Sequence, residues 1–287
     1  MNDYTVFTDS GCDIALEILE EWGVKCCQLT FTFDDSDRVY SNYDMGNEEF
    51  YTKLREGHVA KTSATNIAAF TEAFEEELKK GNDILYIGFS SGISGTYNAG
   101  RAAANFLQNE YPDRKLFAID TLSASAGLGL FIRLTLDKKE AGATIEEAAQ
   151  YILDNRLNIC HWFTVDDLMY LKRGGRISPT LAIAGSALGI KPVMHVDNEG
   201  HLINVSKARG RMASFKALAK KYDELAVNPS QGPVFISHGD CLDEAEKLAS
   251  MIEEKHGVKP FLTYIGPVIG AHAGCGTVAL FFQGKER

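Results

Sequence analysis

A run of small and hydroxyl-bearing residues, SSGISGTYNAG at positions 90–100, is well suited to bind an anion. It follows the apolar run Ile84–Phe89, typical of a buried parallel strand, and leads into residues 97–109, whose apolar side chains recur on one helical face. Glycines allow a ligand to approach the backbone closely, and a helix N-terminus presents unpaired N–H groups that favour an anion. The run therefore predicts an anion site, but a plain strand-to-helix turn uses the same residue types.

A second hydroxyl-rich stretch, KTSATN at positions 61–66, opens the amphipathic pattern that predicts a helix from Ile67 to Lys80. It is thus a second hydroxyl-rich loop that opens a helix. A simple N-cap by Thr65 or Asn66 explains the same residues equally well.

Two further side chains lie among glycines, where a ligand can come close to the backbone. His272 lies in the glycine-rich segment 266–276, and its imidazole could bind a carboxylate or a phosphate. Arg173 lies in the turn 172–176, where its guanidinium could pair with an oxyanion. An exposed loop histidine and an exposed basic turn are the alternatives. The other histidines, including His161 and His238, are interpreted as strand or strand-end residues without an assigned partner.

A serine hydrolase is an alternative that the sequence leaves open. Residues 88–92, GFSSG, match the GxSxG nucleophile elbow between a strand and a helix. Ser90, Asp240 and His272 follow one another in the order of an α/β-hydrolase triad. Against this, no HGGG-type oxyanion segment is present, and the loop continues through residues 93–95 before the helix begins. Neither a P-loop nor a GxGxxG dinucleotide fingerprint occurs.

The overall composition describes an ordinary globular protein. The chain has 287 residues, 45% of them hydrophobic and 24% charged, enough for a sizeable core and two domains. Its formal net charge is −10, and lysines and arginines do not cluster, which argues against nucleic acid and anionic membranes as partners. An anionic ligand must therefore be held by local groups.

Cysteine usage and hydropathy indicate the compartment. The six cysteines are scattered, with neither a CxxC pair nor metal-ligand spacing, at positions Cys12, Cys26, Cys27, Cys160, Cys241 and Cys275. Such thiols suggest a reducing cytosol, and the sequence predicts no metal and no cofactor. No apolar run reaches about 18 residues, so we expect a cytoplasmic protein without stable membrane insertion.

The order of the expected elements predicts an α/β protein with two domains. Strands alternate with helices over residues 1–160, which predicts an N-terminal α/β/α domain with a parallel sheet. Residues 161–287 mix helices with hairpin signals, notably the turn at 197–200, which predicts a C-terminal α+β domain with a mixed sheet.

Several local signals predict particular helices. Residues 47–57 are expected to form a helix capped by Asn47. Residues 144–155 are expected to form a helix in which Thr144 and Glu147 have capping-box spacing. Pro179–Leu188 is expected to be a short helix with the proline at its first position.

Short segments along the whole chain resemble those of the DegV family. They are Thr8-Asp9-Ser10, Thr62-Ser63, Ser91–Tyr97, Ile119-Asp120-Thr121, Tyr170–Ile177, Lys191-Pro192 and the terminal Gly270–Gly276. Together, and in this order, they are far more specific than any one of them. The resemblance implies a fatty-acid-binding protein that holds the carboxylate in an interdomain cleft and buries the acyl tail in one domain. In the FakB subset of the family, a separate kinase phosphorylates the bound fatty acid, so the resemblance implies a carrier and not an enzyme.

The family's motifs, carried over to this sequence, imply a set of residues around the carboxylate. They are Thr62, Ser63, Ser94, the N–H of Gly95, His272 and Arg173. Two departures affect the geometry of the loops and not the choice of residues. Cys275 replaces the usual proline of the terminal segment, and Ala64-Thr65 stands where the family often has Gln-Pro.

Overall fold

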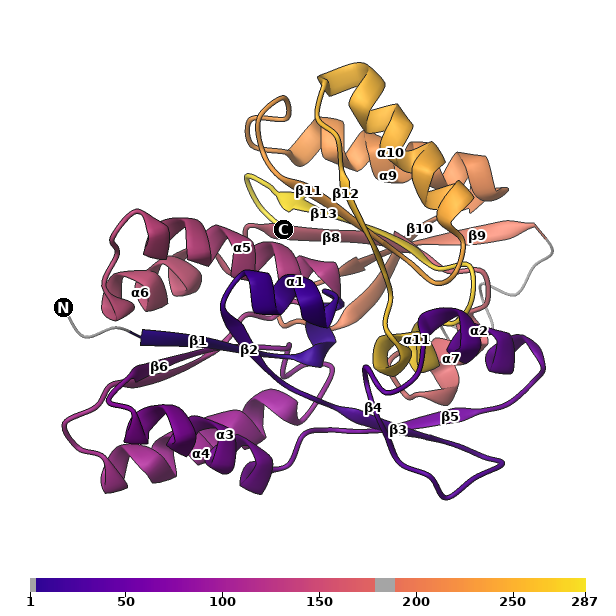
Figure 1. Ribbon diagram of the computed structural model, residues 1–287. Helices are drawn as coiled ribbons and strands as arrows, with labels where there is room; N and C mark the ends of the chain where they lie inside the picture. Colours follow the sequence, from indigo (N-terminus) through magenta and orange to yellow (C-terminus); the bar gives the residue numbers. More distant parts are fainter. Residues whose placement is uncertain (1–3, 179–188) are drawn as a thin grey trace.

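The computed structural model describes residues 4–178 and 189–287, which contain three β-sheets (Figure 1). The first sheet is fully parallel, and its strands are, in spatial order, β2 (Val24–Cys27), β1 (Tyr4–Asp9), β6 (Asp83–Gly88) and β7 (Leu116–Asp120). Helices α3 (Ile67–Lys79) and α4 (Thr96–Glu110) pack together on one face of this sheet. The shorter helices α1 (Leu16–Glu21) and α6 (Ile145–Asn155) lie against β2 and against β6 and β7.

The second sheet is mixed and has six strands. They are, in spatial order, β10 (Leu202–Arg209), β9 (Ile190–Val196), β8 (Ile159–Thr164), β13 (Val278–Gln283), β11 (Val234–His238) and β12 (Phe261–Tyr264). All neighbours are antiparallel except β11 and β12. Helices α9 (Arg211–Leu225) and α10 (Leu242–His256) pack together and cover its outer face (Figure 1). The predicted α/β class, with a parallel sheet and a separate mixed sheet, is confirmed; the boundary at residue 160 stays a prediction.

Helix α5 (Ala126–Glu140) lies between the two sheets and contacts β6 of the first and β8, β11 and β13 of the second. A helix in such a position must be apolar around its circumference. Its first two turns meet this requirement, because the seven residues from Ala126 to Ile132 are all buried. Glycines at 127 and 129 allow close packing: a Cβ on Gly127 would collide with His161, and one on Gly129 with Ile14.

A small antiparallel sheet was not predicted. Its strands are β4 (Tyr40–Ser41), β3 (Thr30–Phe33) and β5 (Ala60–Ser63), and α2 (Asn47–Arg55), α7 (Leu168–Arg173) and α11 (Pro267–Ala273) lie beside it (Figure 1). Part of the stretch expected to be a loop, residues 61–66, is therefore the strand β5, because its backbone pairs with β3.

The glycine-rich segment 266–276 also differs from the expectation of a loop, because it contains helix α11. Pro267 at the first position presets the helical φ. At Gly270 a Cβ would lie 2.6 Å from the Tyr51 hydroxyl oxygen, so the glycine lets α11 pack closely on α2. The glycines of this segment thus serve packing between helices as well as turns.

The local predictions have mixed outcomes. The helix at residues 47–55 is present, but the cap at Asn47 was wrong, because Gly46 occupies the N-cap position. The capping box of Thr144 and Glu147 is confirmed. Asn66 caps α3 by accepting from the N–H of Ala69 at 2.9 Å. The helix expected at Pro179–Leu188 lies outside the described residues.

A buried carboxyl group joins the parallel sheet to the second sheet. Asp13, just after β1, accepts from the N–H of Gly266 at 2.9 Å and from the Ser125 hydroxyl at 2.5 Å. Ser125 in turn shares a hydrogen bond of 2.9 Å with Ser237 on β11, and Thr263 on β12 donates to the Asp13 carbonyl at 2.9 Å. Burial raises the pKa of Asp13 to about 8 from the ordinary 3.8, although the hydrogen bonds from the Ser125 hydroxyl and the Gly266 N–H oppose this shift.

Asp13→Asn should remove one contribution to the pH dependence of stability. Because the folded pKa of Asp13 is raised, this group alone binds a proton in the folded state and not in the unfolded state between about pH 4 and pH 8, and its contribution to the free energy of unfolding falls as pH rises through this range. Asparagine tolerates the positive φ of 50° at this position and cannot titrate. In urea unfolding, the free energy of unfolding of the wild type minus that of the variant should fall by about 1.4 kcal/mol per pH unit across this range. Parallel stability curves for the two proteins would contradict the assignment.

Candidate functional site

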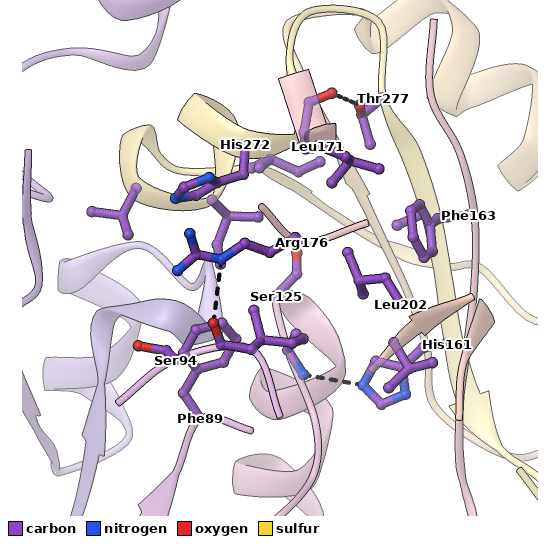
Figure 2. A pocket seen from close by; sticks show the side chains of 18 of the residues that line it. Phe89, Ser94, Ser125, His161, Phe163, Leu171, Arg176, Leu202, His272 and Thr277 are labelled. Atoms are coloured by element: carbon purple, nitrogen blue, oxygen red, sulfur yellow. Dashed lines mark hydrogen bonds between the residues drawn. The ribbon is translucent and has the colours of Figure 1, made fainter. Parts of the chain in front are cut away.

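An apolar pocket lies where loops of the parallel sheet, helix α11 and the mixed sheet meet (Figure 2). It contains about 920 Å³ of space that no protein atom fills, open space at the mouth included. Its apolar lining includes Leu29, Phe89, Ile93, Phe163, Leu171, Val196, Leu202, Ile265, Val268, Ile269 and Phe281. Figure 2 shows Ser94, Arg176 and His272 on one side of the pocket, and Phe163, Leu202 and His161 on the other. The pocket thus has a polar side and a side where apolar residues predominate.

The first hydroxyl-rich loop brings Ser94 and Gly95 to the pocket at the start of α4. The Ser94 hydroxyl accepts from the N–H of Thr96 at 3.2 Å and shares a hydrogen bond of 2.9 Å with the Thr96 hydroxyl. Gly95 is exposed, and no atom lies within 4 Å of where its Cβ would be. An anion can therefore approach the N-terminus of this 15-residue helix without meeting a side chain.

Thr62 and His272, 210 residues apart in sequence, contact each other at the pocket. The Thr62 hydroxyl and Nε2 of His272 lie 2.8 Å apart. Nδ1 of His272 is buried and has no hydrogen-bond partner within the described part of the chain. Burial and the nearby charge of Arg176 lower the pKa of His272 to about 4, so the imidazole is neutral at pH 7.

The alternation of side chains along β5 decides which hydroxyl faces the pocket. Thr62 and Ala64 line it, whereas Ser63 between them is exposed and does not. Successive residues of a strand point to opposite sides, so adjacent positions cannot both face the ligand. The two hydroxyls that the motif places next to each other are therefore not equivalent.

The arginine at the pocket is Arg176 and not Arg173. Arg176 is half-buried, lines the pocket and donates from Nε to the carbonyl of Ile93 at 3.3 Å. Arg173 is exposed, is absent from the lining and lies with its guanidinium 5.4 Å from the ring centre of Tyr170. The sequence predicts Arg173 from this basic turn, whereas the residue of the same turn that lines the pocket is Arg176.

His161 also lines the pocket, and sequence reasoning gave it no role. Its Nδ1 is 2.9 Å from the carbonyl of Ile159, to which it donates, and its Nε2 accepts from the N–H of Ala124 at 3.2 Å. Burial lowers the pKa of His161 well below its ordinary value, so the ring is neutral. With both nitrogens paired, the ring presents mainly its carbon edges to the pocket.

The serine-hydrolase alternative is wrong in its geometry, because its three residues have other partners. Ser90 is fully buried and donates to the carbonyl of Gly200 at 3.0 Å. Asp240 pairs with Arg55, and Nε2 of His272 contacts Thr62. The described residues therefore contain no Ser-His-Asp relay at these positions.

None of the helices in the described ranges combines the length and the apolar character needed to cross a lipid bilayer.

Comparison with known proteins identifies relatives along the full length of the chain. A DegV-family model, which describes uncharacterised proteins, matches residues 3–285. A DegV domain-containing protein of Clostridium perfringens is 42% identical over 289 residues, covering 100% of this chain and 99% of that protein. A second such protein, from Lactococcus lactis, is 28% identical over 97% of this chain and 96% of its own length.

Solved structures share the fold. A DegV lipid-binding protein from Thermotoga maritima superposes with a TM-score of 0.85 at 28% identity, covering 99% of each chain. DegV from Bacillus subtilis, a fatty-acid-binding protein, has a TM-score of 0.86 at 26% identity, covering 99% of this chain and all of its own. A fatty-acid-binding DegV protein from Thermus thermophilus has a TM-score of 0.84 at 25% identity, covering 98% of this chain and 99% of its own. By sequence and by fold, this chain belongs to the DegV family.

Proposed function

We propose that this protein binds a long-chain fatty acid, with the acyl tail on the apolar side of the pocket and the carboxylate on the polar side. The observation that carries the proposal is an apolar pocket with polar groups of distant segments gathered on one side (Figure 2). Fatty acids bind to related proteins of the same fold, which supports this assignment.

The polar side has the groups that a carboxylate needs. The hydroxyls of Thr62 and Ser94 and the N–H of Gly95 are neutral donors, and Arg176 adds a positive charge. The neutral imidazole of His272 holds the Thr62 hydroxyl in place. An anion can thus be held locally, although the chain as a whole carries a net charge of −10. We do not assign Ser63 and Arg173, which the family motif also suggested, to the carboxylate, since neither lines the pocket.

The tail should supply most of the affinity, and the polar groups should orient the ligand. At about 0.8 kcal/mol per buried CH₂, a saturated tail of about sixteen carbons such as that of palmitate contributes on the order of 12 kcal/mol before ordering costs. A hydrogen bond to a charged group contributes about 1.5–3 kcal/mol.

The protein would act as a carrier in fatty acid metabolism and not as a catalyst. A separate kinase would phosphorylate the carboxylate, which we place beside the exposed Gly95 and the half-buried Ser94. The six free cysteines suit a reducing compartment, and we place the carrier in the cytoplasm.

Native mass spectrometry of the purified protein, followed by denaturing extraction, tests the function itself. We expect a bound mass that matches a long-chain fatty acid and that is released without covalent attachment. A protein that stays empty even after incubation with palmitate would overturn the proposal.

Removing polar side chains from the pocket should weaken the binding of the carboxylate and leave the binding of the tail nearly unchanged. Ser94→Ala should weaken palmitate binding by roughly tenfold or more, because a hydrogen bond to a charged group is lost. His272→Ala should act in the same direction through Thr62. Hexadecanol has the same tail without the carboxylate and should bind the variants nearly as well as the wild type. If titration calorimetry shows equal losses of affinity for palmitate and hexadecanol, these residues do not bind the carboxylate.

The two arginines of the basic turn form a matched pair of variants. Arg176→Ala should weaken palmitate binding by roughly tenfold, because a half-buried charge beside the carboxylate is removed. Arg173→Ala should leave the affinity within about twofold of wild type, since its guanidinium lies over Tyr170 outside the pocket. The reverse order of effects would place the carboxylate elsewhere.

The titration of His272 checks the electrostatics of the site. Because burial lowers its pKa to about 4, the His272 ring of the delipidated protein should stay neutral between about pH 5 and pH 8. NMR of the histidine rings, with His272→Gln to assign the signal, should show no protonation in this range. A midpoint near the ordinary 6.5 would mean that the ring is open to water.

A further inference from the structure

The turn between β9 and β10 joins two residues of the pocket wall. Val196 ends β9, Leu202 begins β10, and both line the pocket. Asp197 stiffens the turn between them: its carboxylate accepts from the N–H groups of Glu199 and His201, each at 2.9 Å. A displacement of this turn would therefore move two residues of the apolar wall.

The turn packs tightly against the first hydroxyl-rich loop, residues 90–95. The buried Ser90 donates to the carbonyl of Gly200 at 3.0 Å and accepts from the N–H of Gly92 at 3.2 Å. A Cβ on Gly92 would lie 2.6 Å from the carbonyl oxygen of Glu199, and one on Gly200 would collide with the Ser90 hydroxyl. The loop that carries Ser94 is thus held against the turn that carries the apolar wall.

Arg287 ties the same turn to a second part of the wall. Its Nη1 donates to the carbonyl of Asp197 at 3.1 Å and to that of Leu122 at 2.8 Å. Its Nη2 reaches the Ser123 hydroxyl at 3.4 Å, directly before Ala124 and Ser125, which line the pocket. One side chain therefore links the turn to the loop that follows β7.

The remaining donors of Arg287 are also paired. Nε donates to the carbonyl of Ile159 at 3.1 Å, and Nη2 donates to that of Arg156 at 2.6 Å. These five bonds match the five N–H donors of a guanidinium, which offsets part of the cost of burying its charge. The acceptors come from three separate segments, residues 122–123, 156–159 and 197, so loss of the side chain would remove the links between them together.

We propose that Ser90 and Arg287 act as positioning residues that clamp the β9–β10 turn as a wall of the acyl pocket and thereby slow the release of the bound ligand. The clamp joins the loop that presents the carboxylate donors to the wall that covers the tail. This role rests on the proposed fatty-acid binding and adds to it, since neither residue lines the pocket.

The test compares Ser90→Ala, Arg287→Ala and Arg287→Lys with the control Arg133→Ala. The Arg133 guanidinium also donates several hydrogen bonds, from Nε and Nη2 to the carboxylates of Asp137 and Glu140, but it lies on α5 and does not line the pocket. The rate of release of cis-parinaric acid, a fluorescent long-chain fatty acid, is followed after addition of excess palmitate. Amide hydrogen exchange of residues 196–202 is measured in the delipidated proteins, together with the thermal midpoint.

We expect Ser90→Ala and Arg287→Ala to release the probe roughly tenfold faster, because each variant loses the hydrogen bond that the side chain donates to the turn, at Gly200 and at Asp197. Exchange at residues 196–202 should rise more than elsewhere, Arg287→Lys should recover part of both effects, and Arg133→Ala should match wild type.

Unchanged release and unchanged local exchange in both alanine variants would overturn the clamp. An equal rise in exchange along the whole chain, with a lower thermal midpoint, would also overturn it, because the residues would then serve general stability. If wild-type protein does not bind the probe, the proposed function fails, and local exchange alone decides whether the turn is clamped.

Discussion

The buried carboxyl of Asp13 is the contact on which the arrangement of the two large sheets depends. It receives hydrogen bonds from Ser125 at the start of α5 and from Gly266 before α11, while Ser125 reaches Ser237 on β11. These segments are the start of helix α5, the residue before helix α11 and a strand of the mixed sheet. A buried polar group must be paired, so the three segments can approach one another only in an arrangement that satisfies this carboxyl. The pocket forms in the space that this arrangement leaves.

The same arrangement makes one side of the pocket more polar than the other. Ser125 faces it but is already bonded to Asp13, and His161 faces it with both nitrogens paired. Ser125 and His161, which lie among the apolar residues of the pocket, thus already have hydrogen-bond partners within the protein. On the other side, the N-terminus of α4 is open at Gly95. This difference in hydrogen-bond satisfaction sets the orientation that an amphipathic ligand would take.

Predictions from the sequence succeeded where a local pattern has one structural outcome. The apolar runs and helical periods predicted the parallel sheet with its helices, and Thr144 with Glu147 predicted a capping box that is present. The predictions failed where contacts with distant segments determine the local secondary structure. The polar stretch at 61–66 becomes a strand because β3 lies beside it, and the glycine-rich end becomes α11 because Tyr51 and Phe50 pack on it.

The sequence by itself determined the strands and helices of the parallel sheet, the two hydroxyl-rich segments and a histidine among glycines, because these depend on residue types close together in the chain. Only the tertiary structure decided which of their side chains share a site. It brought Thr62 to His272 across 210 residues, turned Ser63 outward and placed Arg176 instead of Arg173 at the pocket. The direction of a side chain depends on strand register and on how the helices pack, and both are settled by contacts between distant parts of the chain.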